Sequence, residues 1–177
     1  MEWGTDLLPI SEEQKFVEAY LKLQKYRFGN RLSYTIEIEE GCEAYKIPKL
    51  SLVTFVENAC VHGIEDKAAQ CWIFVRVYQK QDELYMEIED TGSGMAEAYL
   101  SILREKMEHA SIEMLKQKGS VGMVNACLRL KMYTEERVKF LLESEEHVGT
   151  MVTISIPVHA LKSVSYTHLR AHETRRH

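Results

Sequence analysis

The sequence lacks a long hydrophobic run. No stretch approaches the roughly 20 consecutive apolar residues that a membrane-spanning helix needs, and the residues after Met1 do not follow the pattern of a signal peptide. The four cysteines include no Cys-x-x-Cys pair, and Cys60 and Cys127 lie within apolar runs. Buried, reduced thiols are therefore expected, which suits a cytoplasmic domain.

The sequence also has fewer basic than acidic residues. The chain has 22 Lys and Arg residues against 27 Asp and Glu residues, a formal net charge of -5. Nucleic-acid backbones attract basic surfaces, so this balance argues against nucleic acid as the main partner. What is present, 45% hydrophobic and 28% charged residues in a chain of 177, is typical of one globular domain with a short appendage.

The appendage is the C-terminal segment 163–177. It has no core pattern and holds three of the seven histidines. Its residues 164–174 resemble the translation of a transposase adapter used in DNA sequencing libraries. We therefore expect the natural reading frame to end or to be interrupted near Lys162, with a His-rich metal-binding tail as the alternative.

The order of helical and strand patterns predicts an α+β fold. Ser11-Glu-Glu-Gln14 has the pattern of a capping box, which predicts a helix that starts there and ends near Gly29. Alternating apolar residues predict a strand at 32–39, and a second helix is expected after Pro48, over about 49–62. The remaining predicted elements are strands at 71–79 and 84–90, helices at about 96–108 and 122–133, and strands at 138–144 and 150–157. Together they predict a two-layer sandwich of one mixed sheet with helices on one face.

The first of four polar motifs lies in the helix expected at 49–62. Asn58 and His62 are four residues apart and therefore share one helix face. Glu57 follows an apolar stripe, where a carboxylate is costly unless it has a task or a partner. An Asn amide oxygen is a suitable ligand for Mg²⁺, and Glu57 is a candidate proton acceptor. Taken alone, however, the motif is better explained as a helix end capped by Gly63.

The second motif, Asp90-x-Gly92-x-Gly94, follows the strand at 84–90. The strand brings Asp90 to an end of the sheet, where its carboxylate could accept a hydrogen bond from an exocyclic amine such as that of adenine. The two glycines allow the backbone to bend and to approach a ligand closely. Taken alone, the motif is an ordinary Asp/Gly turn.

The third and fourth motifs are also made of short, flexible residues. Gly119-Ser-Val-Gly122 precedes a predicted helix, whose free N–H groups would favour an anion such as phosphate. No Gly-Lys-[Ser/Thr] sequence follows, so this is not a Walker motif, and a flexible linker is the alternative. Gly149-Thr150 joins the last two strands, and Thr150 is expected to reach the same pocket as Asp90.

In this order, the four motifs resemble the N, G1, G2 and G3 boxes of the GHKL ATPases, the superfamily of gyrase B, Hsp90, MutL and the histidine kinases. The resemblance covers about residues 50–157 and implies the Bergerat fold, a two-layer sandwich with ATP under a mobile lid. Further motifs are similar to those of YesM/LytS-type sensor kinases and extend the resemblance to about residues 10–157. These are the segment from Tyr20 to Leu32, Ile47-Pro48-Lys-Leu50, Val56-Glu57-Asn58-Ala59, and Gly122-Met-Val-Asn125.

The resemblance implies ATP and Mg²⁺ as ligands. It implies that Asp90 contacts the adenine amine, that Asn58 coordinates Mg²⁺, and that Glu57 and Asn58 are catalytic, with Glu57 as the base. The other residues that it places around ATP are His62, Gly92, Gly94, Gly119, Gly122 and Thr150. A lid from about Leu103 to Gly119 would close on the nucleotide.

The implied reaction is transfer of the γ-phosphoryl group of ATP to a histidine, followed by relay to a response regulator. In this subfamily the phosphoacceptor histidine lies upstream, in a helix followed by a Pro-His-Phe motif, whereas the first histidine here is His62. The chain is therefore expected to act on a histidine helix outside itself. The expected parent is a homodimeric inner-membrane sensor, of which this chain is the cytoplasmic end.

The resemblance also divides the chain into three parts. Residues 1–30 would be a residual dimerisation or linker helix, residues 31–162 the catalytic domain, and residues 163–177 the tail. Without the rest of the dimerisation helices, residues 10–28 would expose an apolar stripe, so we expect self-association or disorder there.

Three alternative functions stay open. The chain could be another kind of GHKL ATPase, in which Glu57 activates water, although it lacks the transducer domain that gyrase B and MutL would add. It could be an anti-sigma-type serine kinase, against which the segment from Tyr20 to Leu32 argues. It could also be a nucleotide-binding module without turnover.

Overall fold

The structure is a computed structural model that describes residues 6–64, 69–111 and 121–164. Its centre is a five-stranded sheet in the order β2-β4-β5-β7-β6. Only β2 and β4 are parallel, and the other neighbours are antiparallel. The strands are β2 (Leu32–Ile38), β4 (Cys71–Lys80), β5 (Glu83–Asp90), β6 (Lys139–Glu145) and β7 (Gly149–Pro157).

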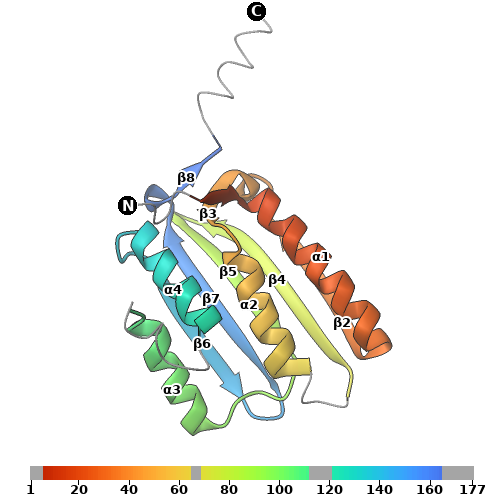
Figure 1. The fold of residues 1–177 in the computed structure, drawn as a ribbon. Coiled ribbons are helices and arrows are strands. Elements are labelled where there is room, and N and C mark those ends of the chain that lie inside the picture. Colours follow the sequence, from red (N-terminus) through yellow and green to blue (C-terminus); the bar gives the residue numbers. More distant parts are fainter. Residues whose placement is uncertain (1–5, 65–68, 112–120, 165–177) are drawn as a thin grey trace, which may run out of the picture.

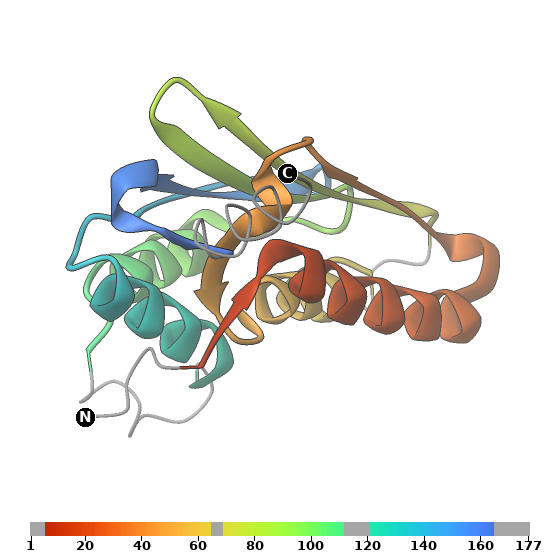
Figure 2. The ribbon, with the colours of Figure 1, turned by 90° about the horizontal axis from the view of Figure 1, so that it is seen from above.

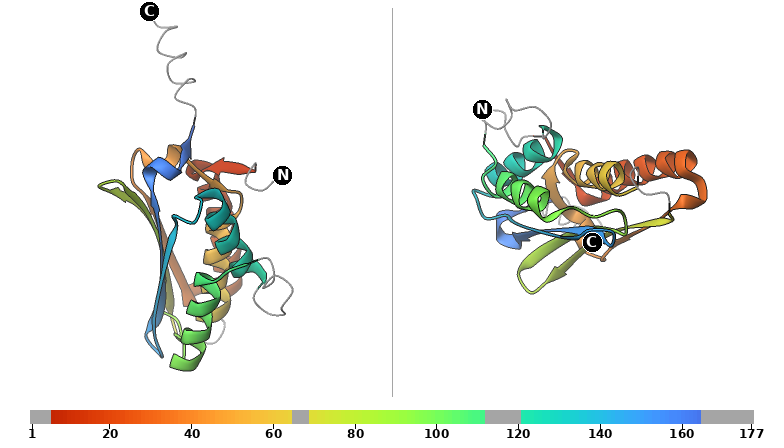
Figure 3. Two further views of the ribbon diagram at one scale, coloured as in Figure 1. Left: turned by 90° about the vertical axis from the view of Figure 1, so that its left-hand side faces the viewer. Right: turned by 90° about the horizontal axis from the view of Figure 1, so that it is seen from below.

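Four helices lie on one face of this sheet and form the second layer (Figures 1 and 3). They are α1 (Ile10–Phe28), α2 (Ser51–Ala59), α3 (Glu97–Glu108) and α4 (Val121–Tyr133). After Ala59, the chain continues as a π-helical segment, Cys60–Ile64. The predicted α+β two-layer sandwich with one mixed sheet is therefore confirmed.

The sheet has one buried and one partly exposed face because strand residues alternate between faces. The helix-facing residues of its two central antiparallel strands are almost fully buried, among them Ile73, Val75, Leu84 and Met86. Within the described residues, no helix covers the opposite face (Figure 3). Aromatic side chains stack there instead, with Trp72 on Phe74 at 5.8 Å and Tyr78 on Tyr85 at 5.3 Å between ring centroids.

A second, smaller sheet was not predicted from the sequence. It has the order β1-β3-β8 and consists of β1 (Leu7–Pro9), β3 (Tyr45–Pro48) and β8 (Lys162–Ser163). Each strand has two to four residues, too few for an alternating pattern to stand out. The last of them pairs Ser163 with Tyr45, so the fold extends one residue past the expected boundary at Lys162. Residues 165–177 lie outside the described residues.

The predicted capping box at Ser11 is wrong. Helix α1 begins at Ile10, its N-cap is Pro9, and no side chain makes a cap hydrogen bond there. Strand β1 leads directly into the helix, so Ser11 is already inside its first turn. Glu13, which belongs to the same motif, is completely buried and binds another part of the chain.

Helix α1 is packed on the body of the domain. It lies beside α2 and β2 in the helical layer (Figure 2), and Val17 and Leu21 are fully buried. Self-association or disorder of this helix in the absence of the other dimerisation helices stays a prediction. Its outer face keeps Phe16, Leu23 and Tyr26 exposed. In the part of the chain that the structure describes, no helix is both long and apolar enough to cross a membrane.

If α1 belongs to the folding unit, truncating its buried face should destabilise the whole domain. Leu21 is 0% exposed and Leu23, two residues on in the same helix, is 63% exposed. We expect Leu21→Ala to lower the free energy of unfolding by about 2–5 kcal/mol and Leu23→Ala to change it by no more than about 0.5 kcal/mol. Urea denaturation of both variants measures this, and equal small effects would show that α1 folds separately.

Candidate functional site

A pocket lies between α2, the first turn of α4 and the end of the sheet at Asp90. Four of the predicted site residues line it together: Asn58, His62, Asp90 and Thr150. The rest of its wall is apolar and is formed by Phe55, Ala59, Ile88, Met95, Met123, Leu142 and Val152. A mostly apolar wall with a few convergent polar groups is typical of a small-molecule site. The volume of the pocket is about 20 Å³, so it has to open before it can hold a ligand of the size of a nucleotide.

Helix α2 supplies one side of the pocket. Asn58 and His62 both line it, as their four-residue spacing predicted. The change from α-helix to π-helix falls between them, after Ala59, and such segments are frequent at functional sites. The backbone oxygen of His62 accepts a hydrogen bond from the Ser93 hydroxyl at 3.0 Å. The centroid of the His62 ring lies 6.3 Å from that of the Tyr99 ring on α3.

The sheet supplies the other side. Asp90 is the last residue of β5, is 5% exposed, and lies opposite Thr150 of β7 in the strand pairing. Its Oδ1 accepts a hydrogen bond from the Gly92 backbone N–H at 2.8 Å, which forms the turn that leads out of the strand. Asp90 and Thr150 line the same pocket.

The glycines after Asp90 are required by contacts within the protein. A Cβ atom at Gly92 would lie 2.3 Å from the Cα of Gly63, and one at Gly63 would lie 2.8 Å from Oδ1 of Asp90. Gly94 has a φ of 68°, and its Cβ would lie 2.1 Å from the backbone oxygen of Glu145. Close packing of three turns, as well as close approach of a ligand, therefore explains why glycine stands here.

Gly122 differs from these glycines. It lies in the first turn of α4, where an added Cβ would meet only Cγ2 of Thr54, at an ordinary 3.8 Å. The fold itself therefore leaves room for a larger residue at this position. Gly119 and most of the predicted lid lie outside the described residues, and Leu103, where the lid was expected to begin, is buried within α3.

Glu57 is placed differently from what its neighbours suggested. Its side chain is exposed, and it does not line the pocket. The expectation of a carboxylate in an apolar neighbourhood is wrong. The apolar stripe of α2 is buried, whereas Glu57 lies on the exposed side of the helix. Its role as a base stays a prediction. Among the described residues, no group of three or more His, Cys, Asp or Glu side chains is arranged to hold a metal ion.

Sequence reasoning missed the apolar wall and one hydroxyl. Met95 and Met123 each directly follow a motif glycine, a position that could have identified them. The Ser144 hydroxyl lies 2.8 Å from that of Thr150, and it accepts a hydrogen bond from the Met95 N–H at 2.9 Å. It thereby ties β6 to the turn after Gly94. Its position within a strand has no sequence signal.

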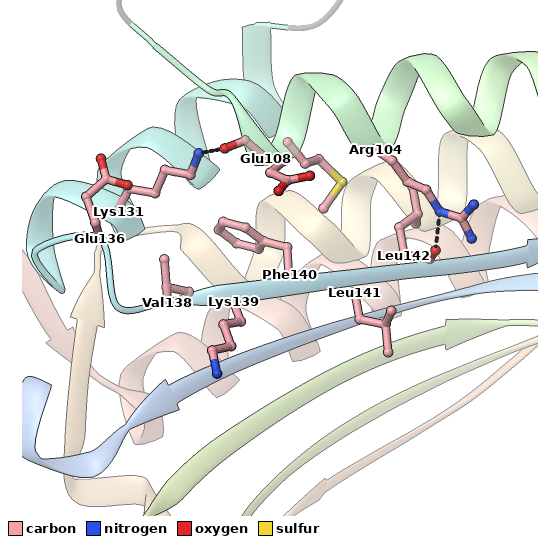
Figure 4. A pocket seen from close by; sticks show the side chains of 10 residues that line it. Arg104, Glu108, Lys131, Glu136, Val138, Lys139, Phe140, Leu141 and Leu142 are labelled. Carbon is pink, nitrogen blue, oxygen red and sulfur yellow. Dashed lines mark hydrogen bonds between the residues drawn. The ribbon is translucent and has the colours of Figure 1, made fainter.

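A larger cavity, of about 410 Å³, lies between the ends of α3 and α4 and the edge strand β6 (Figure 4). None of the predicted site residues lines it. Two of its charged side chains already bind the protein: Arg104 donates to the backbone oxygen of Leu142 at 2.9 Å, and Lys131 donates to that of Glu108. We therefore place the functional site at the smaller pocket, where residues of α2, α4 and the sheet meet.

Comparison with known proteins identifies the family to which the chain belongs. A family described as histidine kinase-, DNA gyrase B-, and HSP90-like ATPase matches residues 48–160. The chain is 29% identical to the sensor protein LytS of Bacillus anthracis over 153 residues, and 28% identical to the sensor histidine kinase YesM of Bacillus subtilis over 152 residues. These matches cover 85% and 86% of this chain but only 25% and 24% of those proteins.

Solved structures show the same fold. The catalytic domain of the histidine kinase ThkA superposes with a TM-score of 0.58 at 14% identity, over 85% of this chain and 93% of that one. The histidine kinase domain of a blue-light activated kinase from Erythrobacter litoralis gives 0.57 at 16% identity, over 86% and 62% of the two chains.

The two classes of glycine lead to a testable difference. Gly92→Ala forces a Cβ into the Gly63 backbone and should lower the free energy of unfolding by about 1–3 kcal/mol or more. Gly122→Ala has room for its Cβ and should leave this free energy within about 1 kcal/mol of that of the parent chain. Thermal denaturation compares the two, and equal destabilisation would contradict the close packing at Gly92.

Proposed function

Because the chain belongs to the family of histidine kinase-, DNA gyrase B-, and HSP90-like ATPases, we propose that it is the ATP-binding catalytic domain of a sensor histidine kinase. It would transfer the γ-phosphoryl group of ATP to a histidine outside this chain. The observation that carries this proposal is the convergence of Asn58, His62, Asp90 and Thr150 on one pocket. The chain spans about a quarter of the length of the sensor proteins that it matches, so their full activity is carried over only as a proposal.

The sheet side of the pocket would bind adenine. Asp90 has the acceptor oxygens that the exocyclic amine of adenine needs, in a buried position where such a bond is stronger than in water. Thr150, held by Ser144, would complete the polar edge. The apolar side chains of Met95 and Met123 would pack against the ring and exclude water.

The helix side would bind the phosphates. Mg²⁺ is usually held by one or two protein oxygens together with substrate phosphates and water, and the amide oxygen of Asn58 is a ligand of this kind. The first turn of α4, with Gly122, would present N–H groups that have no acceptor within the helix and therefore favour phosphate. When bound, Mg²⁺ would neutralise charge on the phosphates.

The transfer itself would need positioning more than covalent help. A neutral imidazole nitrogen attacks the γ-phosphorus, the bond from this phosphorus to the β,γ-bridging oxygen breaks, and ADP leaves. Glu57 is exposed one residue from Asn58, so it could align an approaching imidazole or take its proton. The pocket would contribute orientation and charge stabilisation.

We also propose the partners and location that this reaction implies. The acceptor would be a histidine on a helix of a dimeric parent, and the phosphoryl group would pass on to an aspartate of a response regulator. The domain would work on the cytoplasmic side of the membrane. An acceptor helix supplied in a transfer assay would separate a kinase from a nucleotide-binding module without turnover.

Titration calorimetry with a non-hydrolysable ATP analogue tests the assigned roles. Asp90→Asn should weaken binding about 10- to 100-fold, because a charged hydrogen-bond acceptor is lost from a buried site. Asn58→Ala should lose only the part of the affinity that depends on Mg²⁺. Asp82→Asn is a matched control, since Asp82 is exposed in the turn at the far end of β5. An intact, folded chain that binds no nucleotide would refute the ATP-site proposal.

A further inference from the structure

Glu13 is a buried carboxylate that the nucleotide site does not use directly. It lies in α1 and is 0% exposed. Its Oε2 accepts a hydrogen bond from the Leu50 N–H at 2.9 Å, and its Oε1 accepts one from the Leu52 N–H at 3.1 Å. A carboxylate is rarely buried unless its oxygens are bonded in this way. Burial raises the pKa of Glu13, and the two backbone hydrogen bonds oppose that shift.

These two bonds supply the N-terminal cap of α2. A helix begins with N–H groups that have no partner within it, and a Ser, Thr, Asp or Asn at the N-cap usually binds one of them. The N-cap of α2 is Leu50, which has no suitable side chain and a left-handed backbone with a φ of 68°. Glu13 therefore accepts, from another helix, the hydrogen bonds that the side chain of an N-cap residue usually accepts.

The same turn is held from two further directions. Arg129 of α4 donates to the backbone oxygen of Lys49 at 2.8 Å, and the Lys49 N–H donates to the backbone oxygen of Asp6 at 2.8 Å. Lys49 and Leu50 thus form a junction of α1, α2, α4 and the segment before β1. Figure 1 shows α1 and α4 on either side of α2.

The junction lies at one end of α2 and the nucleotide pocket at the other. Helix α2 has nine residues, Ser51–Ala59, and is therefore about 13 Å long. A helix this short moves as a rigid rod. Fixing its first turn therefore helps to set where Asn58 and His62 stand. Asp90 and Thr150 are held by strand pairing, and the far end of the α2 segment is held by bonds from Ser93 to the backbone oxygens of His62 and Gly63.

We propose that Glu13 is a positioning residue for the nucleotide site, which sets Asn58 and His62 against Asp90 by anchoring the first turn of α2 to α1. The inference rests on the proposed function. It implies a selective effect, because releasing α2 moves the phosphate side of the pocket and leaves the adenine side in place. It also implies that any displacement of α1 reaches the site through this carboxylate.

The test is calorimetric titration of the full chain with a non-hydrolysable ATP analogue, with and without Mg²⁺. In Glu13→Gln, an amide group replaces one acceptor oxygen and faces a backbone N–H. We expect the gain in affinity that Mg²⁺ gives to fall about fivefold or more, and the affinity without Mg²⁺ to stay within about twofold of the parent value. Glu12→Gln is the matched control, since Glu12 is on the same helix and forms an ion pair with Lys15 at the surface.

Each other outcome overturns the inference. Equal losses with and without Mg²⁺ in a folded variant would show a general structural role, and unchanged affinities would show no role. A parent chain that binds no nucleotide would refute the proposed function, and the inference would fall with it. Binding by the parent without a change in Glu13→Gln would refute the inference alone.

A measurement on the unaltered chain decides the case if Glu13→Gln does not fold. By reciprocity, a nucleotide that fixes Asn58 must also stabilise the anchored end of α2. Hydrogen exchange of the Leu50 and Leu52 amides should therefore slow when the analogue and Mg²⁺ are added, whereas the analogue alone should have a smaller effect. Unchanged exchange at both amides would overturn the inference.

Discussion

The site depends on one packing constraint, the close approach of the turn after β5 to the end of the α2 segment. Gly92 lies against Gly63 so closely that a Cβ atom on Gly92 would come within 2.3 Å of the Gly63 Cα. Asp90 fills the space beside them, and its Oδ1 holds the Gly92 N–H. Because this contact joins the sheet to the helical layer, it brings the carboxylate of β5 and the polar residues of α2 to a single pocket. Without it, the motifs would lie on separate elements and form no site.

The repetitive parts of this fold could be predicted from the sequence, because their signals are local. The long strands and the helices α1 and α2 have apolar patterns of their own, and the four polar motifs have fixed places along the chain. Long-range contacts have no such signal. The capping-box pattern at Ser11 pointed to the start of α1, whereas the residue that matters, Glu13, caps a helix 37 residues away. In the same way, nothing local shows that Ser144 binds Thr150 or that β1 pairs with β3.

The two sides of the pocket are held by different interactions, and this difference bears on the proposed function. The sheet side rests on continuous strand pairing from Glu83–Pro157 to Asp90–Thr150, which opens only with the whole sheet. The helix side rests on the buried apolar face of α2, on hydrogen bonds at Lys49 and Leu50, and on bonds from Ser93 to His62 and Gly63. Under the proposed function, the sheet side would hold adenine and the helix side would meet the incoming acceptor.

The exposed position of Glu57 is compatible with the proposed transfer to an external acceptor. A glutamate that activates water has to stand within a closed site, where the water is held against the γ-phosphate and bulk solvent is excluded. Here Glu57 is exposed on α2, while its neighbour Asn58 lines the pocket. A carboxylate in this place can meet a group that arrives from outside, such as an imidazole on another helix. Under the proposed function, the neutral imidazole is itself nucleophilic and needs only alignment, which an exposed Glu57 would supply.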